Sequence, residues 1–104
     1  MEAKDLFSLL KKLEIPVAYD HFDEKVKPPY LRYDLADTHN FLADGHVYDT
    51  IYRIDIELVT ATKDMALERK LEALLNSFKW SKSTQYSSDE KVYITVYEFE
   101  ERIE

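Results

Sequence analysis

VYDTIYRIDIELVT, residues 47–60, decides the fold, because its apolar and polar side chains alternate along most of its length. One set comprises Tyr48, Tyr52, Ile54, Ile56 and Leu58, and the other comprises Asp49, Arg53, Asp55 and Glu57. Successive side chains of a β-strand point to opposite faces of the sheet. The stretch therefore predicts a long strand in an antiparallel sheet that is covered on one face only.

The residues before this strand predict a helix and a hairpin. Leucines at helical spacing indicate a helix over residues 3–14, which Pro16 ends. Residues 17–19 favour a short extended segment, and Pro28 and Pro29 favour an extended chain leading into a strand over residues 30–35. A connection over residues 36–46 contains Asp44 and Gly45, a turn signal, so we expect a hairpin with a long tip.

The residues after the long strand predict a second helix and a second hairpin. A leucine-rich helix is expected over residues 63–78, with Thr62 as its cap and Asp64 in its first turn. Strands follow over residues 79–86 and 92–99, joined by a polar turn over residues 87–90. The last strand is apolar on both faces, so it lies either centrally in the sheet, which we favour, or against another subunit.

These elements predict one α+β domain over residues 1–104, with a mostly antiparallel sheet of four to five strands and two helices packed on one face. Hydrophobic residues make up 45% and charged residues 34% of the 104 residues, which is typical of a folded domain. Without cysteine the chain has no disulfide framework and no thiolate chemistry. The sequence start lacks a signal-peptide pattern, and no apolar stretch has membrane-spanning length, so we expect a soluble cytoplasmic protein.

The charge balance argues against a nucleic-acid-binding surface. There are 14 basic and 21 acidic residues, and the formal net charge is -7. Affinity for a phosphate backbone depends on lysines and arginines that displace counterions. We therefore expect no tight nucleic acid binding.

The sequence gives little support for a known catalytic motif. A single glycine excludes the phosphate-binding loop, the dinucleotide fingerprint and the serine elbow, which each need at least two. Asp55 and Glu57 share a strand face, as the carboxylates of a metal-dependent nuclease do. Leu58 and Val59 follow where such sites usually carry a basic residue, so a solvated charged face is favoured.

The three histidines are weak metal-site candidates. His21, His39 and His46 fall in expected loops that also contain acidic residues, which leaves a loop-built metal site open on ligand chemistry. No HExxH pair is present, and solvated loop histidines are the favoured interpretation. We assign no catalytic, cofactor-binding or metal-binding residue and expect no enzyme activity.

Tyrosine is the overrepresented residue type, with eight copies. Tyrosines are enriched in protein interfaces, because they bury a large area and keep a polar tip. Core packing is favoured for Tyr48, Tyr52, Tyr93 and Tyr97. The interface candidates are Tyr30, Tyr33 and Tyr86, together with Phe41 and Leu42, whose apolar side chains are unusual in a solvent loop.

Several segments together resemble a viral protein family. They are IPVAYDHF (15–22), KPPYLRYDL (27–35), NFLADGHVYDTIYRIDIELVTATKD (40–64), the leucine-rich helix, and VYITVYEFE (92–100). This order resembles the tail terminator family of long-tailed bacteriophages, also called tail completion or head-tail joining proteins. The resemblance spans nearly the whole chain.

The resemblance implies an α+β domain that assembles into a hexameric ring, caps the tail tube and joins the tail to the head. The implied partners are other copies of the chain, the tail tube protein and the head-tail connector protein. The implied location is the host cytoplasm during assembly and then the neck of the virion. We expect the 36–46 connection to reach a neighbouring subunit or the tube. Two other interpretations stay open: a small metal-dependent hydrolase, and an acidic module that binds a basic protein.

Overall fold

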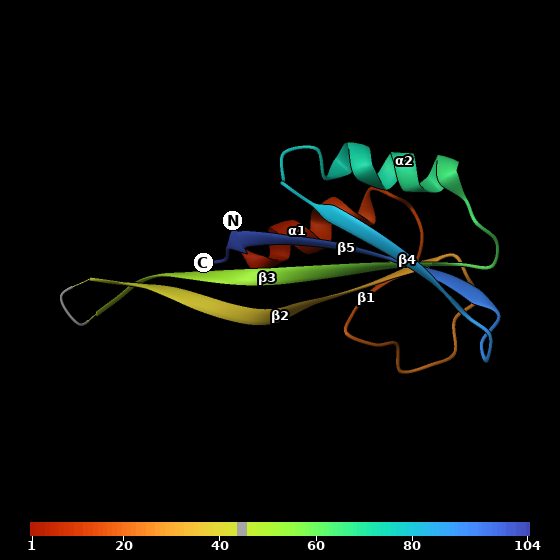
Figure 1. Ribbon diagram of the computed structural model, residues 1–104, viewed down its shortest axis with the longest axis horizontal. Coiled ribbons are helices and arrows are strands. Elements are labelled where there is room, and N and C mark those ends of the chain that lie inside the picture. The colour runs from red at the N-terminus through yellow and green to blue at the C-terminus, as the bar shows by residue number, and fades with distance from the viewer. Residues whose placement is uncertain (44–45) are drawn as a thin grey trace.

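The computed structural model describes residues 1–43 and 46–104, with side chains described for residues 1–38 and 50–104. In this part of the chain, five strands and two helices form an α+β domain, which confirms the predicted fold class (Figure 1). The elements are α1 (Ala3–Lys11), β1 (Val17–Tyr19), β2 (Tyr30–Ala43), β3 (His46–Thr60), α2 (Met65–Leu74), β4 (Ser81–Ser87) and β5 (Val92–Arg102). The strand order is β1-β2-β3-β5-β4, and only the β1–β2 pair is parallel.

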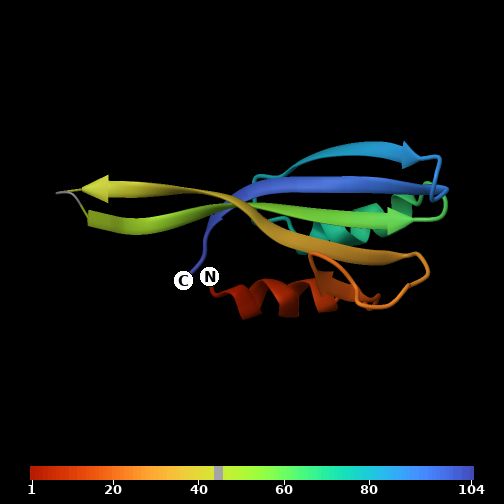
Figure 2. The ribbon, with the colours of Figure 1, turned by 90° about the horizontal axis from the view of Figure 1, so that it is seen from below.

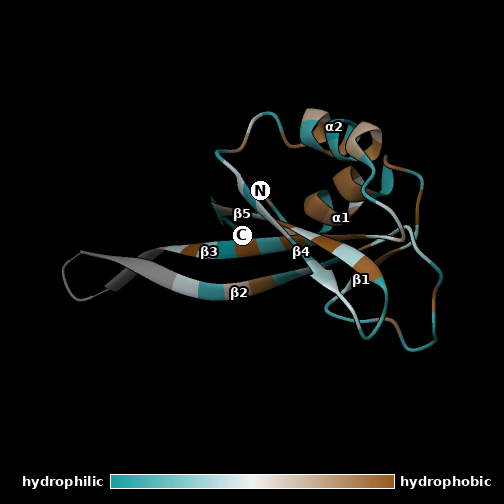
Figure 3. Ribbon diagram, turned by 45° about the vertical axis from the view of Figure 1, so that its right-hand side comes forward, coloured by the Kyte–Doolittle hydropathy of each residue, from teal (hydrophilic) through white to brown (hydrophobic). Residues whose placement is uncertain are grey.

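The alternation of β3 builds the core. Ile54, Ile56 and Leu58 are fully buried on the face that both helices cover (Figure 1). The helices contribute the buried leucines Leu6, Leu10, Leu71 and Leu75 to the same cluster. Figure 3 shows β3 with alternating hydrophobic and hydrophilic bands, as expected for a strand with one covered face. We call the opposite, uncovered face of the sheet the open face.

β5 lies between β3 and β4, so the favoured central placement of the last strand is confirmed. Tyr97 and Phe99 are buried on the covered face, and the ring of Phe78 stacks on that of Phe99 at 4.4 Å between centroids. On the open face Val92 is buried, and Ile94 is partly buried. Apolar side chains on both faces of β5 are therefore buried or partly buried within a single subunit.

The end of helix α1 and the start of helix α2 differ from those predicted. Helix α1 ends at Lys11, because the chain turns at Glu14, whose φ is 61°, before Pro16 is reached. Helix α2 begins at Met65, and its cap is Asp64, whose side chain accepts a hydrogen bond from the Leu67 amide at 3.0 Å. The predicted Thr62 cap is wrong, because only the residue directly before the first turn reaches that amide.

The predicted 36–46 loop is also wrong, because β2 runs on for 14 residues and β3 for 15. Their pairing continues to Ala43 opposite His46, with register shifts between Leu35 and Asp37 and between Phe41 and Leu42. Such bulges interrupt the alternation of side chains that marks a strand in a sequence. Figures 1 and 2 show the two strands extending past the rest of the sheet. We call this extension, residues 36–43 and 46–50, the arm.

Candidate functional site

The arm is the part of the described chain that has least support from the rest of the domain. β1 pairs with β2 only over Leu31–Tyr33, and the pairing of β5 with β3 begins at Ile51. Within the described residues, no third strand lies beside the arm, and the longest dimension of the molecule is 50 Å against 26 and 22 Å. A two-stranded ribbon is marginally stable in water when nothing packs on it. The arm is therefore suited to contact another molecule.

Phe41 and Leu42, the predicted contact residues of the connection, lie in the part of β2 that belongs to the arm. Their side chains are outside the described residues. The backbone thus gives these two residues a strand setting in place of the expected loop. Their role in an interface stays a prediction.

At the base of the arm, the open face carries closely spaced charges. Arg53 contacts Asp37 at 2.8 Å (Nη1 to Oδ2) and Asp55 at 3.5 Å (Nη2 to Oδ2). Asp34 lies directly opposite Asp55 in the β2–β3 register, and each has a buried Oδ1 without a hydrogen-bond partner. Burial, and then the negative charge of Asp55, raise the pKa of Asp34. This face therefore holds carboxylates that the subunit itself satisfies incompletely.

Asp55 and Glu57, the two carboxylates that share a strand face, each lie beside an arginine. Glu57 Oε1 lies 3.6 Å from Arg32 Nη2, and Asp55 pairs with Arg53. Both carboxylates are partly buried on the open face. In the described part of the chain, no group of three or more histidine, cysteine or acidic side chains is placed to hold a metal ion.

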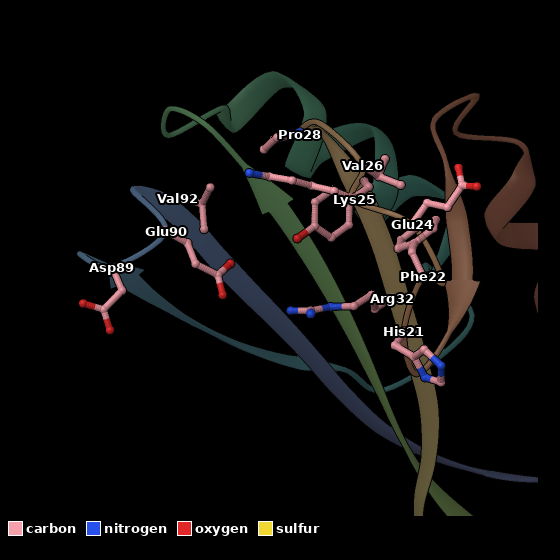
Figure 4. A pocket seen from close by; sticks show the side chains of 11 residues that line it. His21, Phe22, Glu24, Lys25, Val26, Pro28, Arg32, Asp89, Glu90 and Val92 are labelled. Carbon is pink, nitrogen blue, oxygen red and sulfur yellow. The ribbon is translucent and has the colours of Figure 1, made fainter.

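A groove of about 530 Å³ lies at the other end of the sheet from the arm (Figure 4). Its walls are the loop over residues 21–28, the start of β2, and the turn before β5. Phe22 packs edge-on against Tyr30 at 5.3 Å, and the Arg32 guanidinium lies 5.7 Å from the Tyr30 ring centre. Cations and carboxylates share the lining, namely Lys25, Arg32, Glu24, Asp89 and Glu90. A groove with this mixture of charges fits a protein surface as its binding partner better than it fits a polyanion.

The three histidines lie on different elements. His21 lies in a loop as predicted, with Nδ1 at 2.9 Å from Asp20 Oδ2 and Nε2 at 3.6 Å from Asp23 Oδ1. The hydrogen bond to Asp20 raises the pKa of His21. His39 and His46 belong to β2 and β3, so their predicted loop positions are wrong, and their side chains are outside the described residues.

The three tyrosines predicted as interface residues lie on different surfaces. Tyr30 lines the groove, whereas Tyr33 is half-buried on the covered face against Tyr19 and Phe7. Tyr86 is 52% exposed on β4, and its ring lies 4.9 Å from that of Tyr93. These residues do not form one contact surface within a subunit.

The tyrosines predicted for the core differ in how far they are buried. Tyr97 is fully buried, and Tyr52 is partly buried against the core cluster. Tyr93 is half-buried at the β4 side of the sheet, and the side chain of Tyr48 is outside the described residues. The core prediction is therefore confirmed most clearly for Tyr97.

The sequence interpretation missed a charged network that ties α2 to β4 and β5. Glu68, although 3% exposed, contacts Lys63 Nζ at 2.7 Å and Lys82 Nζ at 3.1 Å. Lys82 also contacts Glu72 at 2.7 Å, and the Tyr97 hydroxyl donates to Glu72 Oε2 at 2.7 Å. The available signal was the i, i+4 spacing of the two glutamates, which puts them on one side of the helix.

A scan against models of known protein families finds no match, and a search of curated proteins finds none either. Neither helix of the described chain has the length and apolar composition needed to span a membrane.

Proposed function

We propose that this chain is a structural virion assembly protein of a long-tailed bacteriophage or prophage. It caps the tail tube and joins the tail to the head connector as a hexameric ring, and its side chains catalyse no reaction. Support comes from the order of motifs that resembles the tail terminator family and from the α+β domain that this resemblance implies.

The observation that carries the proposal is the arm. Its strands pair with each other and with no further strand of the described chain, and they project past the remaining sheet (Figure 2). Exposed strand edges are open to pairing with other chains, and folded monomers usually protect them. A long unprotected ribbon is an understandable feature in a protein whose working state is an assembly.

The charge of the chain fits a ring through which DNA passes. With a formal net charge of -7, the subunits repel a phosphate backbone, so the genome moves through the lumen without being held. In this proposal the protein acts in the host cytoplasm during assembly and afterwards at the neck of the virion.

Replacement of Phe41 and Leu42 together by serine tests the proposal. We expect weaker ring formation or tube attachment with little change in the melting temperature of the monomer. Light scattering and negative-stain electron microscopy, each with and without tail tube protein, measure the assembly. Met65→Ser is the matched control, because Met65 is 55% exposed on α2 and its loss removes apolar surface away from the arm.

Other outcomes would favour another function. Wild-type protein that stays monomeric both alone and with tube protein would contradict the proposal. Stabilisation by Mg²⁺ or Zn²⁺, with turnover lost in Asp55→Ala or Glu57→Ala, would indicate a metal-dependent hydrolase. Salt-sensitive capture of a basic partner would indicate an acidic binding module.

A further inference from the structure

The outer edge of β4 is the longest unprotected sheet edge outside the arm. β4 pairs with β5 on one side, and no strand of the described chain lies on its other side. Its first six residues are exposed, and its pairing with β5 has no register shift. Proteins protect such edges with proline, a bulge or an edge-facing charge. β4 has no proline, and its lysine, Lys82, bonds to Glu68 and Glu72 of α2.

The arm has a free edge of similar length. Along β2 the arm covers residues 36–43, which span roughly 26 Å, whereas the seven residues of β4 span roughly 23 Å. The two edges differ in position, because β4 is the last strand on one side of the sheet and the arm extends β2 and β3 beyond it. One subunit can therefore offer its arm while its β4 receives another arm.

The arm and β4 lie in stretches of the sequence that differ in charge. Residues 33–52, which include the arm, form the longest stretch without lysine or arginine and contain four aspartates. Residues 73–88, which include β4, form the longest stretch without an acidic residue and contain two lysines. In a chain with a net charge of -7, most pairs of surfaces from two copies repel each other. Between the arm and β4 this repulsion is reduced, because β4 contains no acidic residue and its Lys82 is already paired with Glu68 and Glu72.

We propose that the β2 edge of the arm of one copy adds as a strand to the β4 edge of the next copy. The unpaired amides and carbonyls of the two edges then form interstrand hydrogen bonds, and the marginal ribbon becomes part of a larger sheet. The contact is head-to-tail, so repetition gives a ring when the rotation between copies closes. This inference rests on the proposed ring function and names the surface that receives the arm.

Proline substitution on β4 tests the receiving edge. Successive amides of an antiparallel strand point to opposite sides, so either Ser83→Pro or Thr84→Pro removes an amide that faces outward. The variant that keeps the monomer's melting temperature identifies this position. In that variant we expect the concentration needed for ring formation to rise at least about tenfold, because proline removes a donor and crowds the added strand. Alanine at the same position, which keeps the amide, is the control and should assemble like wild type.

Cysteine scanning tests strand addition without depending on the proline variants. The chain has no cysteine, so any disulfide must come from the introduced pair. We would combine Thr38→Cys or Asn40→Cys in the arm with a cysteine at each β4 position from 81 to 86 in turn. Neighbouring strands place Cα atoms at disulfide distance. After oxidation, non-reducing electrophoresis should show intermolecular cross-links at alternate β4 positions only, because alternate side chains share a face.

The outcomes separate this inference from the proposed function. Rings that form normally in the folded proline variant, or cross-links without a two-residue period, would overturn strand addition at β4 and leave the ring function standing. A wild-type protein that forms no ring, alone or with tube protein, would overturn both.

Discussion

Replacement of Glu68 by glutamine should destabilise the domain more than any other single charge removal on α2. The Glu68 side chain is 4% exposed and contacts two lysine ammonium groups, Lys63 just before α2 and Lys82 from β4. Glutamine keeps the size of the side chain but loses its charge. The substitution therefore tests the network without creating a large cavity.

The expected cost is about 2 kcal/mol of unfolding free energy. Breaking a fully buried ion pair costs about 3–5 kcal/mol. The Lys63 and Lys82 side chains are 40% and 35% exposed, so water partly compensates them when the carboxylate charge is removed. The loss is then closer to that of one charge-assisted hydrogen bond, about 1.5–3 kcal/mol. For a domain of this size, the melting temperature should fall by about 8–16 °C.

The pH dependence gives an independent check. Burial of Glu68 opposes its ionisation, but hydrogen bonds from Lys63 and Lys82 outweigh burial and lower the pKa of Glu68 below its ordinary 4.5. A lowered pKa means that the ionised carboxylate stabilises the fold above pH 4.5, and that this contribution is lost as the pH falls through the lower folded-state pKa. The difference between wild type and Glu68→Gln should therefore shrink in acid.

Urea unfolding followed by circular dichroism at pH 7 and at several acidic pH values measures both effects. Glu90→Gln is the control, because Glu90 is exposed and the same charge is removed. Its expected effect is within about 0.5 kcal/mol. A Glu68→Gln variant no less stable than this control, or a difference that stays constant into acid, would refute the argument.

Three further predictions concern stability. Asp64→Ala removes the cap of α2 and should cost about 1 kcal/mol in urea unfolding; no loss would mean that the hydrogen bond to the Leu67 amide contributes nothing. Asp34→Asn should stabilise the monomer by about 0.5 kcal/mol at pH 7 by removing a like-charge pair across β2 and β3. Because the pKa of Asp34 is raised, the ionised form opposes folding. This gain should shrink as the pH falls through that raised pKa and vanish below the ordinary value of 3.8, and a gain that persists in acid would contradict the assignment. Ile56→Ala should cost about 2–5 kcal/mol, measured by thermal unfolding, because Ile56 is fully buried under both helices, and a cost below 1 kcal/mol would contradict that placement.

The elements with regular side-chain periods were predictable from the sequence. The alternation in residues 47–60 identified β3 and its buried face, and the leucine spacing identified both helices. The two apolar faces of the last strand indicated its position between neighbours, which the strand order confirms. In each case burial on a defined face imposes the period, so the period reports the structure.

The arm and the charged network were not predictable in the same way. Beyond Leu35, β2 is held by backbone pairing to β3, and the register shifts remove the alternation that would mark a strand. Glu68 has a surface residue's identity, and only the positions of Lys63 and Lys82 make its burial tolerable. The side-chain period of a strand or helix therefore reports neither the paired backbone of the arm nor the lysines that surround Glu68.

The register shift at Ala36 has a consequence for how the arm is aimed. An extra residue on one strand increases the local twist and bends that strand. This residue sits where β2 leaves the shared sheet, away from the core side chains Leu31 and Ile56. Inserting or deleting one residue here would swing the arm through a new angle while the domain beneath it kept its packing. In the proposed ring, such a change would alter the diameter at which successive copies close, with little effect on folding stability.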